Sequence, residues 1–271
     1  MVQKPDGTWS PCRDYCGLNT QTVPDHYPLP NIADFTSRLN GCMIFTKLDL
    51  SKLLKSNVPW PFGLFGWIMM PFGLWNTGCT IQRLMDQLFG DLPNCFVYVN
   101  DILISSRDIQ YHLQHVCKVL DRLLLHGLSL NPDKRVFAAP SLDYLWMRVS
   151  AEGCVPLSIH TYVISAFPQP SDKKGWQHFL GIVNFYRRFI RGAAGLLFPL
   201  TEALKGTVSS LTWSQSMLNS FSTAKSILAN VPTLVHPDPT ARISVSVDAS
   251  GSQVGAVLQQ EVAGSWAPLS Q

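Results

Sequence analysis

The chain has 271 residues, of which 46% are hydrophobic and 14% are charged. This composition excludes intrinsic disorder as the main state, because disordered chains are rich in charge and poor in apolar residues. The net charge of +3 does not decide whether the chain binds nucleic acid, so a basic binding surface would have to be local. The length allows one large domain or two ordinary ones.

Secretion and membrane insertion are not indicated. Residues 1–12 lack the apolar core of a signal peptide. The longest apolar run, residues 63–75, contains Pro71 and is too short to span a bilayer. The seven cysteines are odd in number and scattered, which is typical of reduced thiols. We therefore expect an intracellular protein without a membrane partner.

The first half of the sequence predicts alternating strands and helices. Residues 1–31 read as loops with short extended pieces, residues 43–50 as a strand and residues 63–71 as a hairpin. Further elements are a helix capped by Asn76 or Thr77, a hairpin over 95–105, a helix over 108–126 that ends at Gly127, and a strand over 143–149. The predicted buried stripes of the two helices are Ile81, Leu84, Met85, Leu88 and Phe89, and Leu113, Val116, Leu120, Leu123 and Leu124.

The second half predicts mostly helices and then a hairpin. Residues 156–170 read as a connector, and helices are expected over 172–190, with Trp176, Phe179, Leu180 and Val183 on one face, and over 214–229. Residues 232–239 carry three prolines and read as a linker before a hairpin over 243–260. This order predicts an α+β fold followed by part of another domain.

Two aspartates, Asp49 and Asp101, lie on or beside apolar strands with a helix between them in sequence. If the strands pair, both carboxylates meet at one end of the sheet. Converging carboxylates can hold two divalent ions about 3.5–4 Å apart, the arrangement used in phosphoryl transfer. Aspartate is also common at strand ends and in turns, so the spacing alone leaves a structural role open.

The residues around these aspartates resemble the reverse transcriptase of gypsy-type long-terminal-repeat retrotransposons. The segment Tyr98-Val99-Asn100-Asp101 is similar to the Y-x-D-D hairpin of that family, and Phe45-Thr46-Lys47-Leu48-Asp49-Leu50 to its first catalytic strand. The resemblance covers essentially the whole chain. The other matching segments, in order, are Lys4-Pro5-Asp6-Gly7-Thr8-Trp9, Met70-Pro71-Phe72-Gly73-Leu74, Gln82-Arg83-Leu84-Met85, Leu130-Asn131-Pro132, Asn184-Phe185-Tyr186-Arg187-Arg188-Phe189-Ile190 and Val247-Asp248-Ala249-Ser250.

The resemblance implies a right-hand polymerase. Fingers and palm would occupy 1–150, the helical thumb and connection 151–239, and the start of a ribonuclease H-like domain 240–271. The implied reaction is RNA-directed DNA synthesis, a nucleotidyl transfer that uses Mg²⁺ or Mn²⁺. The implied partners are an RNA or DNA template-primer and deoxynucleotides.

The same resemblance implies roles for single residues. Asp49 and Asp101 would bind the metal, and Lys4 would contact the incoming triphosphate. Phe72 and Gly73 would shape the nucleotide pocket. The remaining implied roles are template contact for Gln82, proton donation to the leaving pyrophosphate for Lys134, contact with backbone phosphates for Arg187 and Arg188, and a ribonuclease H position for Asp248. For the two arginines, a solvated helix face is an equal alternative.

Several positions depart from the family pattern. Asn100 replaces the second hairpin aspartate, and an amide oxygen is a neutral, weaker ligand for a hard cation. Ser10 and Cys16 stand where basic residues are expected, and the segment Ser51–Trp60 is shorter than in the family. The turn Tyr144-Leu145-Trp146 replaces a Phe-Leu-Gly-like primer-contact turn. We therefore expect little or no polymerase activity, and no ribonuclease H site from Asp248 alone.

Three alternatives stay open from the sequence. The first is a non-catalytic nucleic-acid-binding remnant, and the second is an unfolded pseudogene product. The third is a zinc site at Cys12, Cys16 and His26, which would lack a fourth ligand. His112 and His115 are three residues apart and are expected on the polar face of their helix.

Overall fold

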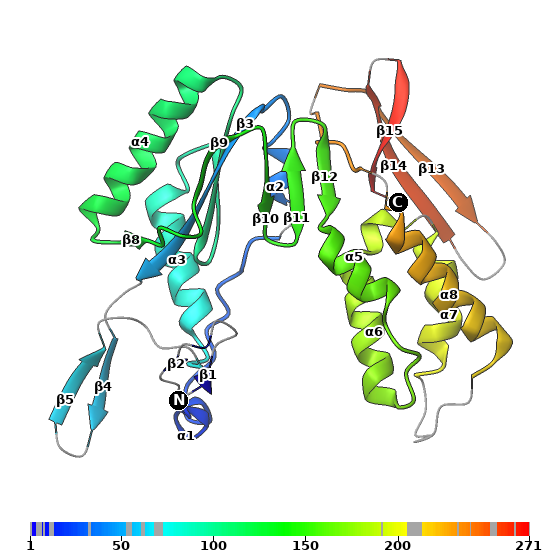
Figure 1. The fold of residues 1–271 in the computed structure, drawn as a ribbon, viewed down its shortest axis with the longest axis horizontal. Coiled ribbons are helices and arrows are strands. Elements are labelled where there is room, and N and C mark those ends of the chain that lie inside the picture. Colours follow the sequence, from blue (N-terminus) through cyan, green and yellow to red (C-terminus); the bar gives the residue numbers. More distant parts are fainter. Residues whose placement is uncertain are drawn as a thin grey trace. The chain divides into compact units, whose positions relative to one another are not determined.

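The chain folds into two units, Met1–Leu142 and Asp143–Gln271, in the computed structural model (Figure 1). The structure describes residues 2–3, 7, 9–10, 14–31, 34–52, 56–60, 63–67, 73–190, 192–204, 213–231, 233–238, 240–249, 254–262 and 264–270. Each unit is described by itself.

The first unit is built on a sheet with strand order β6-β7-β3-β8, and β9 also pairs with β3. The strands are β3 (Ile44–Lys52), β6 (Cys95–Tyr98), β7 (Asp101–Ser106), β8 (Ser129–Leu130) and β9 (Val136–Ala139). Helices α3 (Thr77–Phe89) and α4 (Ile109–Leu125) pack their apolar residues with those of the sheet into one core. The predicted strand over 43–50, the hairpin over 95–105 and both helices are confirmed.

Short elements precede the sheet or lie between its strands. They are β1 (Val2–Gln3), β2 (Trp9–Ser10), α1 (Cys16–Asn19), α2 (Asp34–Ser37), β4 (Ser56–Trp60) and β5 (Gly63–Trp67). The hairpin predicted over 63–71 begins earlier, because β5 pairs with β4. Asn76 precedes α3, but its side chain does not cap the helix. Its amide instead binds the backbone of Val23 and Asp25.

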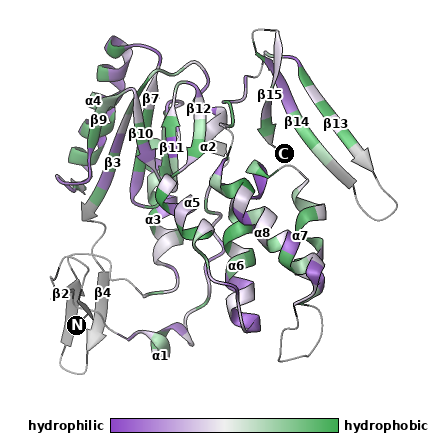
Figure 2. Cartoon of the chain, turned by 45° about the vertical axis from the view of Figure 1, so that its right-hand side comes forward, coloured by the Kyte–Doolittle hydropathy of each residue, from purple (hydrophilic) through white to green (hydrophobic). Residues whose placement is uncertain are grey.

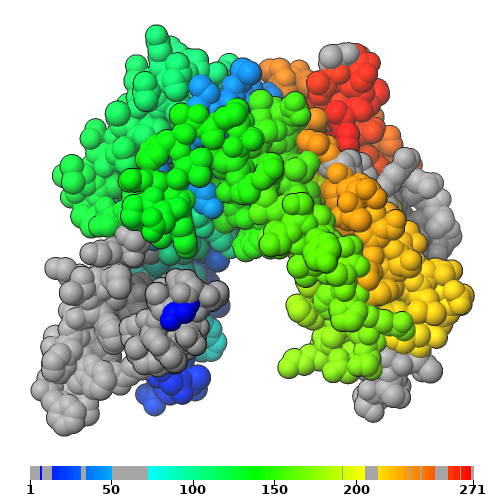
Figure 3. All heavy atoms as spheres, in the orientation of Figure 1, coloured from blue at the N-terminus to red at the C-terminus, as the bar shows by residue number. Residues whose placement is uncertain are grey.

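The predicted buried stripe of α4 is partly wrong. Val116 and Leu123 are buried, whereas Leu113 and Leu124 are 58% and 80% exposed. Helix α4 lies at the surface of its unit (Figure 3), and hydrophobic and hydrophilic residues are interleaved along it (Figure 2). The helix is rotated because the His112 imidazole takes a buried place, 2.7 Å from the Thr46 hydroxyl and 3.0 Å from the Ser106 hydroxyl. The polar-face prediction is therefore wrong for His112.

The His112 network predicts that acid weakens the first unit. Burial, and then the nearby His115, lower the pKa of His112 below its ordinary value of 6.5. The neutral form is thus favoured in the folded chain. Its contribution to stability is complete above about pH 6.5 and is lost as the pH falls below that value.

Urea unfolding at pH 7.5 and pH 5.5 measures this effect. We expect His112→Gln to lose part of the pH dependence, and the exposed His126→Gln to keep it. Equal pH dependence in the native chain and His112→Gln would contradict the assignment.

The second unit begins within a sheet of order β10-β11-β12, whose first two residues belong to the first unit. Its strands are β10 (Ser141–Tyr144), β11 (Met147–Ser150) and β12 (Gly153–Pro156). The single strand predicted over 143–149 is in fact two, because the chain turns at Leu145, whose φ is +52°. The predicted connector over 156–170 contains a helix, α5 (Ser158–Ser165), which buries Ile164.

The other helices of this unit are α6 (Lys173–Phe185), the 3₁₀ turn η1 (Arg187–Phe189), α7 (Ala193–Glu202) and α8 (Gln215–Ala229). Asp172 and Ser214 cap α6 and α8 through their side chains. The predicted face of α6 is confirmed, since Trp176, Phe179, Leu180 and Val183 are all buried. Helix α7 was not predicted.

The last sheet has the order β13-β14-β15, with β13 (Ile243–Ala249), β14 (Val254–Val262) and β15 (Ser265–Ser270). The hairpin predicted over 243–260 is confirmed. The linker predicted over 232–239 is wrong in part, because Leu234 and His236 are buried and Leu234 bridges to Cys154. Among the described residues, no helix is both long and apolar enough to cross a bilayer.

Candidate active site

Asp49 and Asp101 lie directly opposite each other on neighbouring antiparallel strands. Asp49 on β3 pairs with Asp101 at the start of β7, in a register that runs back to Ile44 and Ser106. The alternation of side chains along paired strands places opposite residues on one face of the sheet, about 4.5–5.5 Å apart at their Cβ atoms. The convergence predicted from the sequence therefore follows from this register.

Each carboxylate has a lysine beside it. Lys47 Nζ lies 3.8 Å from Asp101 Oδ1, and Lys134 Nζ lies 3.8 Å from Asp49 Oδ2. Lys47 is on the same strand face as Asp49 because the two residues are two positions apart. Lys47 is an additional residue of the site, and its two-residue spacing from Asp49 is visible in the sequence.

The two aspartates share an environment that is only partly open to solvent. The side chains of Asp49 and Asp101 are 17% and 28% exposed. Burial raises the pKa of the Asp101 carboxyl above its ordinary value, and the charge of Asp49 adds to the rise, whereas Lys47 and Lys134 oppose it. Asp101 therefore gains from any further positive charge placed between the carboxylates.

Asn100 supplies a third oxygen at this end of the sheet. Its backbone carbonyl accepts a hydrogen bond of 3.0 Å from the Leu50 N–H, which ties the hairpin turn to β3. Its side-chain Oδ1 is buried and has no hydrogen-bond partner among the described residues. A buried carbonyl oxygen without a partner is costly. The two paired carboxylates are hard oxygen donors of the kind that Mg²⁺ prefers.

Gln82 on α3 holds the β6–β7 turn from beneath. It is fully buried. Its Oε1 accepts a hydrogen bond of 2.8 Å from the Val99 N–H, and its Nε2 donates to the Val97 carbonyl and to Asp86 Oδ1 at 3.1 and 2.9 Å. Val99 has φ of +52°, a region that is unfavourable for a β-branched residue. The direct template contact expected of Gln82 does not fit this burial, and the side chain positions the turn instead.

Of the residues predicted to contact the incoming nucleotide, the structure describes only Gly73. Gly73 is exposed, has φ of +98°, and its carbonyl accepts a hydrogen bond of 2.8 Å from Asn19 Nδ2. Asn19 Oδ1 also accepts from the Trp75 N–H at 3.0 Å, so this one amide holds the loop before α3. Lys4 and Phe72 lie outside the described residues.

The two arginines after α6 differ in environment. Arg187 is exposed. Arg188 donates to Met147 Sδ at 2.9 Å and lies 5.0 Å from the centre of the Phe189 ring, and burial lowers the pKa of its guanidinium. The sequence did not separate the two, because burial depends on the turn of η1 beside β11.

The remaining candidates are placed as follows. Asp248 lies near the end of β13, in register with Gly255. Cys12 lies outside the described residues, and Cys16 begins α1 with its N–H bound to Asp14. Among the residues that the structure describes, no group of three or more His, Cys, Asp or Glu could hold a metal ion.

Comparison with known families identifies two regions. Residues 52–149 match the family model for reverse transcriptase (RNA-dependent DNA polymerase). Residues 213–270 match the model for the RNase H-like domain found in reverse transcriptase. The first region contains Asn100, Asp101 and Lys134, and Asp49 lies three residues before it.

Curated relatives are transposon polyproteins. The chain is 32% identical over 260 residues to the retrovirus-related Pol polyprotein from transposon 297 of Drosophila melanogaster, covering 91% of this chain and 25% of the relative. It is 31% identical over 274 residues to the Tf2-3 polyprotein of Schizosaccharomyces pombe, covering 96% of this chain and 20% of the relative. The chain thus spans a quarter or less of these two relatives.

Solved structures with a similar fold come from foamy virus. The protease-reverse transcriptase in complex with double-stranded DNA superposes with a TM-score of 0.82 and 21% identity, covering 99% of this chain and 59% of that one. The complex with an RNA/DNA hybrid gives a TM-score of 0.78 and 21% identity, covering 99% of this chain and 38% of that one. The likeness shows a polymerase fold, as the sequence predicted.

Proposed function

We propose that this chain is the polymerase region of a transposon Pol polyprotein, since residues 52–149 match the family model for reverse transcriptase. Its reaction is RNA-directed DNA synthesis. The observation that carries the proposal is the pairing of Asp49 with Asp101 across β3 and β7. Asn100 weakens the site, so we propose that activity in this chain is low.

Different residues of the chain would have different roles in nucleotidyl transfer. Asp49 and Asp101, with the Asn100 amide oxygen, would hold the divalent cation, for which we propose Mg²⁺ or Mn²⁺. The bound ion would activate the primer 3′-hydroxyl and offset charge on the phosphates. Lys134, 65% exposed and beside Asp49, is free to swing toward the leaving pyrophosphate and donate its proton. Lys47 partly balances the carboxylates and competes with the cation for Asp101.

The finer assignments belong to the same proposal. We propose fingers and palm over 1–150, thumb and connection over 151–239, and the start of a ribonuclease H-like domain with Asp248 over 240–271. The ordered motifs support a gypsy-type element. The foamy virus structures with double-stranded DNA and an RNA/DNA hybrid support a template-primer as the partner. The free thiols of the six described cysteines support an intracellular setting.

Primer extension and filter binding on one RNA template with a DNA primer test the function. We expect salt-dependent binding together with slow, Mn²⁺-supported extension that Asp101→Asn abolishes. The exposed Asp133→Asn serves as the matched control and should extend like the native chain. Binding without any extension would favour the non-catalytic remnant, and failure to bind would reject both.

The two neighbouring arginines make a second, internal comparison. Removal of a side chain that binds one phosphate reduces the slope of log K against log salt by about one. We therefore expect Arg187→Ala to lower the slope by about one without changing the melting temperature. Arg188→Ala should lower the melting temperature, because it removes the packing on Met147 and Phe189. The reverse pattern in filter binding and thermal melts would contradict the assignment.

A further inference from the structure

The segment 23–30 is held along one face of α3. It contains three prolines, which fix their own φ and disfavour helical backbone in the residues before them. Four residues, spaced so that they share a helix face, bind this segment. They are Asn76, which binds the backbone of Val23 and Asp25, Cys79, which binds the carbonyls of Asp25 and Tyr27, and Arg83 and Asp86, which bind side chains. The segment is therefore tied to α3 at several points.

Tyr27 is held on two sides. The Arg83 guanidinium lies over its ring, 4.7 Å from the centroid. Arg83 Nη2 lies 2.8 and 2.7 Å from the two carboxylate oxygens of Asp25, and this hydrogen bonding lowers the pKa of Asp25 below its ordinary value. The Tyr27 hydroxyl donates to Asp86 Oδ2 at 2.8 Å. That hydrogen bond, and then burial, raise the pKa of Tyr27, so the phenol remains a donor.

Asp86 connects Tyr27 to Gln82. Its other oxygen, Oδ1, accepts a hydrogen bond of 2.9 Å from Gln82 Nε2. A carboxylate only accepts hydrogen bonds, so the nitrogen of the Gln82 amide, and not its oxygen, faces Asp86. The Gln82 Oε1 is thereby turned toward the Val99 N–H, from which it accepts at 2.8 Å. One series of hydrogen bonds therefore runs from Tyr27 to the β6–β7 turn.

This series ends at the strained part of the candidate site. Val99 has φ of +52°, and Asn100 and Asp101 follow it directly. A β-branched residue keeps such a conformation only when the surrounding contacts hold it. Gln82 is fully buried, so the direction of its amide depends on these protein partners. Without the Tyr27 hydroxyl, the Asp86 carboxylate loses one of its two partners and becomes free to rotate away from Gln82.

We propose that Tyr27 is a positioning residue that fixes the β6–β7 turn through Asp86 and Gln82. Its hydroxyl takes no part in the reaction itself. The value of this coupling for catalysis rests on the proposed function, whereas the coupling is a property of the first unit and is measurable without catalysis. Coupling through such networks is apportioned by double-mutant cycles.

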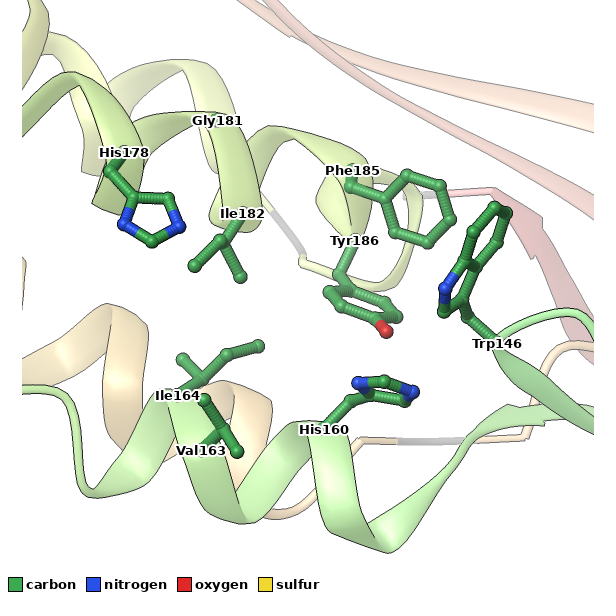
Figure 4. A pocket seen from close by; sticks show the side chains of 9 residues that line it. All are labelled: Trp146, His160, Val163, Ile164, His178, Gly181, Ile182, Phe185 and Tyr186. Atoms are coloured by element: carbon green, nitrogen blue, oxygen red, sulfur yellow. The ribbon is translucent and has the colours of Figure 1, made fainter. Parts of the chain in front are cut away.

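Amide hydrogen exchange of Val99, followed by NMR in the full chain without metal or nucleic acid, tests the proposal. Labelling of tyrosine carbonyls with ¹³C and valine amides with ¹⁵N selects the Tyr-Val peptide bonds, of which the sequence has two, at Val99 and Val163. Val163 lies on α5 in the second unit, where it lines a pocket between α5 and α6 (Figure 4). Its amide is therefore an internal reference for changes that affect the whole chain.

Tyr27→Phe should speed Val99 exchange about 2–10-fold, the worth of one hydrogen bond, and leave Val163 exchange unchanged. Tyr111 on α4 is 61% exposed, and Tyr111→Phe is the matched control that should change neither rate. In an Asp86→Ala background the series of hydrogen bonds is already cut. Tyr27→Phe should then have no effect on Val99 exchange.

Two results would overturn the proposal. The first is an unchanged Val99 exchange rate in Tyr27→Phe. The second is an equal effect of Tyr27→Phe with and without the Asp86 carboxylate, which would mean that Tyr27 acts through packing of its segment. Absence of polymerase activity in the native chain would count against the proposed function alone, since neither exchange rate depends on it.

Discussion

Asn100→Asp is expected to bind Mn²⁺ at least about tenfold more tightly than the native chain. Mutation of even an outer-shell partner of a metal ligand changes metal affinity by about tenfold or more, so a new direct ligand should have at least that effect. The added carboxylate lies next to Asp101, where the native amide contributes no charge. With Asp49, Asp101 and the new side chain, the site carries three negative charges against Lys47 and Lys134. Hard cations bind more tightly as the number of charged oxygen ligands rises.

The same substitution should weaken the metal-free fold. Asn100 Oδ1 is already buried without a partner among the described residues, and a carboxylate there adds uncompensated charge beside a carboxyl whose pKa burial has raised. We therefore expect a lower melting temperature without metal and a larger rise on adding Mn²⁺ than in the native chain.

Electron paramagnetic resonance of free Mn²⁺ measures the metal affinity, and thermal melts at pH 8 measure the stability with and without metal. Primer extension is the third measurement. Asn230→Asp adds the same charge at an exposed position, and it should change neither the Mn²⁺ affinity nor the melting temperature. Unchanged Mn²⁺ affinity in Asn100→Asp would show that this position does not face the ion. Tighter Mn²⁺ binding without extension would place the defect elsewhere in the chain.

Gln82→Leu is expected to lower the free energy of unfolding by about 2–4 kcal/mol. The leucine fills much of the volume but leaves the Val99 N–H and Asp86 without the amide that binds them. Val99 is held at positive φ, so the turn loses the contact that offsets its strain. Because Asn100 and Asp101 follow directly, we also expect weaker Mn²⁺ binding.

Gln87→Leu provides the control, since Gln87 is exposed on the same helix. Urea unfolding monitored by circular dichroism should separate the two variants clearly. Equal stabilities would mean that the buried amide contributes little, and that other contacts hold the turn. Normal Mn²⁺ affinity in a destabilised Gln82→Leu would confine the role of Gln82 to stability.

The elements with strong periodicity or clear caps were predictable. Helix α8 begins where Ser214 caps it, and α6 buries the four apolar residues expected of it. Local chemistry decides these features, because a cap or an apolar stripe depends on residues within a few positions. The short helices α5 and α7 were not predicted, since a helix of two or three turns depends largely on packing.

The residue types of the site could also be read from the sequence. Asp49, Asn100 and Asp101 are visible as polar residues at the ends of apolar strands, and the loss of one carboxylate at Asn100 needs no structure. That Asp49 faces Asp101 depends on the register of β3 and β7, which joins residues about fifty positions apart. No local pattern determines such a pairing.

The sequence by itself therefore determined the kind of chemistry and the weak point of the site. Only the tertiary structure decided which side chains from distant parts of the sequence are buried beside the strands and the turn that carry the site. His112 is buried because Thr46 and Ser106 satisfy its ring, and Gln82 is a support because the β6–β7 turn lies over it. Polar residues of one type bind substrate, contact water or hold backbone according to what surrounds them, and these surroundings come from distant parts of the chain.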